Sequence, residues 1–185
     1  MIKKIKENFI MWNKLKNIQN RADNVWESLK KYHKENGVNY GTYEKEKYIE
    51  TSFSLDNDNK IVKRYHYFID EKNDFLKSII YISEGFNSDK VKDILILASH
   101  FNSLISKGLI RVDTEKGTIS MEYRISLLIP YIYEPEIHFQ CLEHFNHSKD
   151  IVWAFNRLLI FDEDPVFIMV DLMKRVEERE FNKQK

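Results

Sequence analysis

Four residues with metal-binding side chains follow one another at three-residue intervals: His138, Cys141, His144 and His147. Imidazole nitrogens and thiolates are ligands that zinc and related metals prefer. On a helix, neighbouring members would lie on adjacent faces, but the whole set turns about half-way round the axis, so one ion cannot reach all four. A second helix would have to complete the site. We therefore predict no bound metal or other cofactor, and keep His138, Cys141 and His144 as candidate ligands.

Cys141 and His144 also raise the question of a nucleophilic cysteine, because an imidazole one helical turn away increases the thiolate fraction. Such a nucleophile also needs a donor that stabilises an oxyanion, and no glycine-rich elbow accompanies this pair. Both residues fall within an apolar stripe formed by Ile137, Leu142 and Phe145. We therefore predict core residues and a protein that is not an enzyme. A metal-dependent enzyme that uses the histidine–cysteine cluster is the less favoured alternative.

Residues 63–68 interleave basic and aromatic side chains on an expected strand, as nucleic-acid-binding sheets do. The 29 basic residues of the chain are balanced by 29 acidic ones, so no net positive field attracts nucleic acid or an anionic membrane. No phosphate-binding glycine loop or dinucleotide motif occurs. We therefore predict a protein partner, no nucleic acid and no membrane.

The composition indicates one folded domain. With 185 residues, of which 43% are hydrophobic, the chain is long enough to bury a core without cross-links. Cys141 is the only cysteine, which excludes an intramolecular disulfide and is typical of a reducing compartment. No stretch approaches the roughly 18 consecutive apolar residues of a membrane span. The basic start at residues 1–6 lacks the apolar run of a signal peptide. We expect a cytoplasmic protein.

The N-terminal segment predicts one long helix over residues 2–35. Its apolar residues recur at steps of three and four, and Asn36-Gly37 supplies a stop with glycine in the left-handed conformation. Such a helix packs on a sheet through its apolar stripe. Alternatively its first half binds another helix, because Phe9, Met11 and Trp12 widen the apolar surface there.

Five strands are expected after this helix. Residues 48–55, 60–69 and 75–82 are rich in β-branched and aromatic residues and are joined by turn-forming residues, which predicts an antiparallel meander. The stretch 93–128 has the clearest pattern of all. It predicts an apolar helix closed by Gly108, then two strands over 109–112 and 119–127.

Gly117 suits the left-handed position of the hairpin loop that joins these two strands. In the second strand apolar and polar residues alternate strictly, so that one face lies on a core and the other in water or on a partner.

Two helices complete the expected order. One begins near Pro135, with a break at residues 146–148 as one option, and another begins at Asp164-Pro165 and leads into a charged tail. The order is α-βββ-α-ββ-α-α, an α+β fold with helices packed on one face of an antiparallel sheet. We expect a single domain over residues 1–185, which divides into segments 1–36, 43–160 and 165–185.

The pattern of residues 93–128 resembles the YbjN-like family and the class I type III secretion chaperones that share its fold. Those proteins show a leucine-rich helix with an Asn-containing turn, a glycine, a short strand, an acidic turn with glycine and an alternating strand. The matching residues here are Leu95, Leu97, Phe101, Asn102, Leu104, Gly108, Ile110, Asp113, Gly117 and Ile119. The resemblance covers residues 43–160. It implies a non-catalytic protein that dimerises and holds another polypeptide across exposed apolar surface.

We therefore expect a chaperone-like protein-binding module, present as a homodimer. The candidate partner-binding residues are Phe9, Met11 and Trp12 of the first helix, and Tyr65, Tyr67 and Tyr123 of the sheet. The alternative is an immunity or antitoxin-type bacterial protein that neutralises a toxin, with the acidic run 162–164 imitating a nucleic acid. That run also suits the cap of a helix, where the dipole stabilises negative charge.

Overall fold

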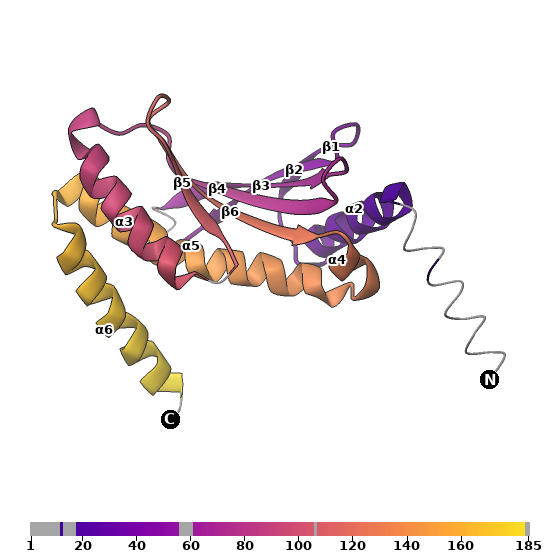
Figure 1. Ribbon diagram of the computed structural model, residues 1–185. Helices are drawn as coiled ribbons and strands as arrows, with labels where there is room; N and C mark the ends of the chain where they lie inside the picture. The colour runs from indigo at the N-terminus through magenta and orange to yellow at the C-terminus, as the bar shows by residue number, and fades with distance from the viewer. Residues whose placement is uncertain (1–11, 13–17, 56–60, 106, 184–185) are drawn as a thin grey trace. The chain divides into compact units, whose positions relative to one another are not determined.

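The computed structural model describes residues 12, 18–55, 61–105 and 107–183. In this part of the chain it shows an α+β fold in which helices pack against a six-stranded antiparallel sheet, so the expected fold class is confirmed. The elements, in chain order, are α2 (Ile18–Glu35), β1 (Tyr40–Tyr43), β2 (Tyr48–Ser54), β3 (Val62–Asp70), β4 (Phe75–Ser83), the 3-10 turn η1 (Ser88–Lys90), α3 (Val91–Leu104), β5 (Leu109–Asp113), β6 (Thr118–Ser126), α4 (Leu128–Ile132), α5 (Pro135–Phe161) and α6 (Pro165–Lys183) (Figure 1).

The strands lie in the order β1-β2-β3-β4-β6-β5. At one edge β1 pairs with β2, with Tyr40 opposite Thr51, and at the other β5 pairs with β6, with Ile110 opposite Met121. The meander and the second hairpin are therefore confirmed.

Two elements were not expected. Strand β1 has only four residues, none of them buried, and it includes Gly41, so it gives no apolar alternation to detect. Helix α4 is a single five-residue turn that contains Pro130.

Residue contacts divide the chain into two compact units. Unit 1 comprises Met1–Phe53, Arg64–Ser78 and Arg124–Glu143, and unit 2 comprises Ser54–Lys63, Ile79–Tyr123 and His144–Lys185. Strands β2, β3, β4 and β6 and helix α5 contribute residues to both. The expectation of a single domain over the whole chain stays a prediction.

In unit 1 the core is built on α2. Ala22, Val25 and Leu29 of the expected stripe are buried, and the helix is followed by Gly37 at φ +63°, as the sequence predicts. Arg21 at the start of this helix is buried and forms an ion pair with Asp74 at 3.1 Å. This pair joins α2 to the turn between β3 and β4.

In unit 2 the core lies between α3 and the second hairpin. Ile94, Leu97, Ala98 and Phe101 form the buried face of α3, and α3 packs against β5. In β6, residues Ile119, Met121 and Tyr123 are buried and alternate with partly exposed polar residues, as expected. Gly117 has φ +63°, which confirms the left-handed position in the loop.

The expected role of Gly108 is wrong. Helix α3 ends at Leu104, and its C-cap residue Ile105 is already extended, with φ −82° and ψ 116°. Gly108 is needed for another reason, because a Cβ atom on it would lie 2.7 Å from Cε2 of Tyr123. The glycine therefore makes room for a buried aromatic ring.

The last two helices are continuous. Helix α5 runs without interruption through residues 146–148, and α6 begins at Pro165 and continues to Lys183. The side chain of Asp164 accepts a hydrogen bond from the backbone N–H of Val166 at 2.8 Å, which caps α6 as expected.

Candidate functional site

His138 and Cys141 lie in unit 1 in different environments. His138 is exposed on α5, and its ring stands edge-on to Tyr32 with the centroids 5.6 Å apart. Cys141 is buried, and burial raises the pKa of its thiol to about 12, although a hydrogen bond with Tyr67 opposes this shift. A thiol with such a pKa is protonated at neutral pH, so Cys141 lacks the thiolate that nucleophilic catalysis requires.

His144 and His147 lie in unit 2 beside Tyr123. The ring of His144 is fully buried, with its centroid 4.9 Å from that of Tyr123. Burial lowers the pKa of His144 to about 3; His147 adds to the shift, and a hydrogen bond with the backbone of Met121 opposes it. Nδ1 of His147 is hydrogen-bonded to the Tyr123 hydroxyl. These imidazoles therefore hold an aromatic residue in the core.

No group of three or more His, Cys, Asp and Glu side chains in the described part of the chain is placed to hold a metal ion. The candidate ligands His138, Cys141 and His144 thus do not assemble a site there. The physical reason is that each has a separate structural environment, exposed for His138 and buried among aromatic rings for the other two.

The three tyrosines expected on a partner-binding surface are buried. Tyr65 and Tyr67 in unit 1 are 0% and 1% exposed, and Tyr123 in unit 2 is 2% exposed. Their expected exposure is wrong because they occupy the strand positions whose side chains face the core. Period-two alternation with Ile69 and Met121 could have shown this from the sequence.

Of the three residues on the first helix, the structure describes Trp12. It is helical and 56% exposed. Phe9 and Met11 lie outside the described residues, so the role of this segment in binding stays a prediction.

In residues 63–68, the side chain of Lys63 is hydrogen-bonded within the chain. Nζ of Lys63 donates to the carbonyl of Ile82 at 2.6 Å, and desolvation lowers its pKa. With Tyr65 and Tyr67 buried, these rings offer no stacking platform for bases.

The three carboxylates of the acidic run 162–164 also have partners within the chain. Asp162 forms an ion pair with Lys90, Glu163 with Arg157, and Asp164 caps α6. Imitation of a nucleic acid by these carboxylates has no support from this arrangement, because each has a partner within unit 2.

An apolar surface is exposed in unit 1, which we call the α4–α5 surface. Its residues are Ile129, Ile132, Tyr133, Phe139 and Leu142, each 44–58% exposed. Ile129 and Ile132 are three residues apart on α4, and Tyr133 is its C-cap residue. Phe139 and Leu142 are three residues apart on α5, so each helix presents its pair on one face. Residues 127–148 contain three glutamates and no lysine or arginine. The segment itself is therefore acidic, and one of its glutamates, Glu134, forms an ion pair with Lys31 of α2 at 3.1 Å.

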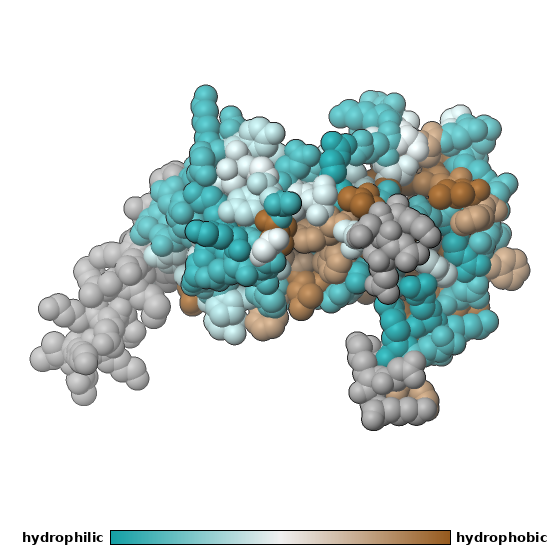
Figure 2. All heavy atoms as spheres, turned by 180° about the vertical axis from the view of Figure 1, so that it is seen from behind, coloured by the Kyte–Doolittle hydropathy of each residue, from teal (hydrophilic) through white to brown (hydrophobic). Residues whose placement is uncertain are grey.

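A second apolar surface lies on α6 in unit 2, which we call the α6 stripe. It consists of Val166, Phe167, Val170 and Met173, which are 44–70% exposed. Ile168, Met169 and Leu172 on the opposite side are buried, and α6 packs against α3. Seen from behind, apolar areas interrupt the mostly polar surface (Figure 2).

Charged and aromatic contacts within unit 2 hold α6 in place. Arg157 on α5 donates to Asp171 on α6 at 2.8 Å, and Arg179 on α6 donates to Asp150 on α5 at 2.6 Å. The ring of Trp153 lies against the guanidinium groups of Arg157 and Arg175, at 4.9 and 5.0 Å.

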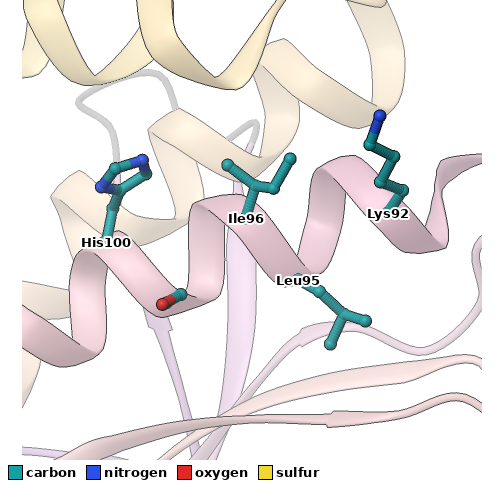
Figure 3. Close-up of a pocket in the computed structure, with 5 residues that line it drawn as sticks. Lys92, Leu95, Ile96 and His100 are labelled. Atoms are coloured by element: carbon teal, nitrogen blue, oxygen red, sulfur yellow. The ribbon is translucent and has the colours of Figure 1, made fainter.

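A hollow of about 430 Å³ lies along α3 in unit 2. Lys92, Ile96 and His100 project from one side of the helix and Leu95 points away from them (Figure 3), with Ser99 completing the lining. All five residues come from one helix, and no second element brings an acid, base or nucleophile to the lining. The hollow does not have the composition of an assembled active site.

The described chain is thus an α+β protein with enclosed imidazole and thiol groups and exposed apolar helix faces. No family model matches the chain, and no curated protein matches it in sequence. Membership of the YbjN-like family stays a prediction. No helix among the described residues has both the length and the apolar character needed to cross a membrane.

Two solved structures are similar to the chain. One is the ExsC–ExsE complex, with a TM-score of 0.47, 14% identity, and coverage of 75% of this chain and 95% of the other. The second is the HopA1–SchA chaperone–effector complex, with a TM-score of 0.41, 11% identity, and coverage of 66% and 90%. Both TM-scores are below 0.5, a level of likeness that does not assign a function.

Proposed function

We propose that this chain is a non-enzymatic, chaperone-like protein-binding module of the YbjN and secretion-chaperone group, which acts in the cytoplasm as a homodimer. It holds another polypeptide at the α4–α5 surface. The observation that supports this proposal is the combination of five exposed apolar side chains with a segment that carries glutamates and no basic residue.

The chemistry of the surface indicates the chemistry of the partner. Burial of apolar side chains supplies affinity of about 25 cal/mol per Å² of apolar area removed from water. Tyr133 and Phe139 are the large aromatic anchors, and aromatic residues dominate the energetics of most interfaces. The surrounding glutamates favour a segment that carries lysine or arginine beside its apolar residues, since complementary charge fixes orientation and speeds association.

Two fluorescently labelled synthetic peptides test this proposal. Both are amphipathic helices with the same leucine face, and the polar face is lysine in one and glutamate in the other. Fluorescence anisotropy should show binding of the lysine peptide at least about tenfold tighter than of the glutamate peptide. Added salt should narrow the difference, because the charges are exposed and screened.

The double variant Ile132→Ser/Phe139→Ser should weaken binding of the lysine peptide by about tenfold or more. The control is Leu95→Ser/Leu104→Ser, which changes exposed apolar residues of α3 in unit 2. Circular dichroism verifies that both proteins fold. Equal loss of binding in the two variants, or equal binding of the two peptides, would show that the α4–α5 surface is not a specific binding site.

A further inference from the structure

The N-terminal segment, residues 1–12, has the chemistry of the partner that suits the α4–α5 surface. Its apolar residues Ile2, Ile5, Phe9 and Trp12 recur at steps of three and four, as on one face of a helix. Between them lie three lysines and one glutamate, a net charge of +2. Trp12, the described residue of this segment, is helical and 56% exposed. The segment thus combines an apolar face with basic side chains.

The apolar face of this segment differs from the face through which α2 packs. With 3.6 residues per turn, a continuous helix would place Ile2 and Phe9 nearly opposite the buried Leu29. The two patterns meet at residues 13–17, where Asn13 and Asn17 are weak helix formers that favour helix ends. The N-terminal segment is therefore a second amphipathic unit, which needs an apolar surface of its own.

Helix α2 begins beside α4 in unit 1. Arg21, near the start of α2, pairs with Asp74 at 3.1 Å, and the carbonyl of Asp74 accepts the backbone N–H of Leu127 at 2.9 Å. Leu127 is the N-cap residue of α4, and α2 packs against α4. An eleven-residue helix is about 16 Å long, whereas residues 135–142 of α5 extend over about 12 Å. The chain before α2 therefore starts close to the α4–α5 surface and is long enough to cover it.

One carboxylate at this surface is available to a lysine. Glu136 is partly buried in the first turn of α5, and among the described residues its side chain has neither a hydrogen bond nor an ion pair. It precedes the exposed Phe139 by three residues, so the two lie on the same side of α5. A segment with lysines beside apolar residues would pair with Glu136 while it covers Phe139.

We infer that the N-terminal segment binds the α4–α5 surface of its own chain and competes there with the partner polypeptide. This inference rests on the proposed function of that surface and adds its regulation. Because the segment is tethered, its effective concentration at the surface is in the millimolar range. A contact with a dissociation constant of about 1 mM would then keep the surface occupied about half of the time. The partner has to displace the segment before it binds.

Disulfide formation in the full chain, with oxidised glutathione as the oxidant, tests where the segment binds. The variant Phe9→Cys/Ile132→Cys should form a bond within one chain at least about tenfold faster than Phe9→Cys/Leu104→Cys. Leu104 is the control because it is an exposed apolar residue of α3 in unit 2. The buried Cys141 gives little background.

Mass spectrometry of proteolytic peptides identifies the bond, and non-reducing gel electrophoresis separates internally linked chains from linked pairs. Equal rates in the two variants would overturn the inference. Linked pairs without internally linked chains would also overturn it, because the segment would then bind a second copy.

Peptide binding tests the competition. The variant Lys3→Glu/Lys6→Glu changes the net charge of the segment from +2 to −2, so that the acidic surface repels it. This full chain should bind the fluorescent lysine peptide at least about fivefold tighter than the wild type does. The control Lys92→Glu/Lys174→Glu makes the same change in total charge at exposed positions of unit 2, and its affinity should equal that of the wild type at physiological salt. Equal tightening in both variants, or none in either, would overturn the competition.

Failure of the inference and failure of the proposed function give different results. If the wild type and the Lys3→Glu/Lys6→Glu variant bind the lysine peptide equally and no internal disulfide forms, the inference fails and the proposed function stands. If the internal disulfide forms but neither protein binds the peptide, the segment occupies the surface and the proposed partner binding fails. Binding by the variant alone would support both.

Discussion

The side-chain amide of Asn102 on α3 exchanges two hydrogen bonds with the backbone of Ile110 in β5. Nδ2 donates to the carbonyl at 3.1 Å, and the backbone N–H of Ile110 donates to Oδ1 at 2.7 Å. The amide therefore pairs with this edge strand as a backbone peptide group would. One residue joins the end of a helix to a strand eight positions later in the chain.

Replacement of Asn102 by alanine should destabilise the protein by about 2 kcal/mol, since two hydrogen bonds of about 1 kcal/mol each are lost near a buried residue. Urea denaturation followed by circular dichroism measures this change. The control is Ser99→Ala, an exposed position on the same helix, where the change should stay within about 0.5 kcal/mol. A similar small effect at Asn102 would mean that these bonds do not stabilise the fold.

Replacement of Gly108 by alanine should cost about 1–3 kcal/mol, because the added methyl group overlaps the ring of Tyr123. The ring has little room to move, since His144 and His147 both contact it. Gly85→Ala is the matched control, because nothing lies within 4 Å of the place its methyl group would take, and it should be neutral or slightly stabilising. Thermal unfolding compares the two. A neutral Gly108→Ala variant would contradict the close packing.

Acid should destabilise the fold through its buried imidazoles. Burial lowers the pKa of His144 to about 3 and also lowers that of His33. Below the unfolded-state pKa of about 6.5 the unfolded chain binds more protons, so stability is complete above pH ~6.5 and falls as the pH drops toward the folded-state pKa. The slope for His144 is up to about 1.4 kcal/mol per pH unit.

Urea denaturation at a series of pH values between 7.5 and 4 measures this dependence. His144→Phe should reduce the slope, whereas the exposed His138→Ala should leave it unchanged. An unaltered slope in His144→Phe would assign the acid sensitivity to other groups.

The thiol of Cys141 should be nearly inert in the folded protein. Its burial and its raised pKa of about 12 keep the thiolate fraction very low, so a disulfide reagent such as dithionitrobenzoate should react at least about 1000-fold more slowly than in concentrated urea. Absorbance of the released thionitrobenzoate follows the reaction. Rapid, complete labelling of the native protein would contradict the enclosed environment of this residue.

Most of the fold could be predicted from local patterns. Short-range residue spacing, which can be read from the sequence, predicts three of its features. These are the helix before Gly108, the alternation of β6 and the positive φ of Gly117. Strand β1 could not be found in this way, because its four residues bury nothing and it is defined by pairing with β2.

The exposed sites were harder to predict, because a sequence shows that a face is apolar without showing what covers it. Residues 166–170 form a continuous apolar run, and only the packing of α6 on α3 separates the buried Ile168 from the exposed Phe167. The same difficulty applied to β3. Its interleaved aromatic and basic residues suggested an exposed surface, but Tyr65 and Tyr67 are buried in the core.

The two edges of the sheet are its shortest strands. At the unit 1 edge β1 has four residues, and at the unit 2 edge β5 has five, among them Arg111 and Asp113. Each offers too few free backbone groups to template a further strand, and charge and glycine make that addition less favourable still. Short edge strands of this kind protect a sheet against growth into fibrillar aggregates.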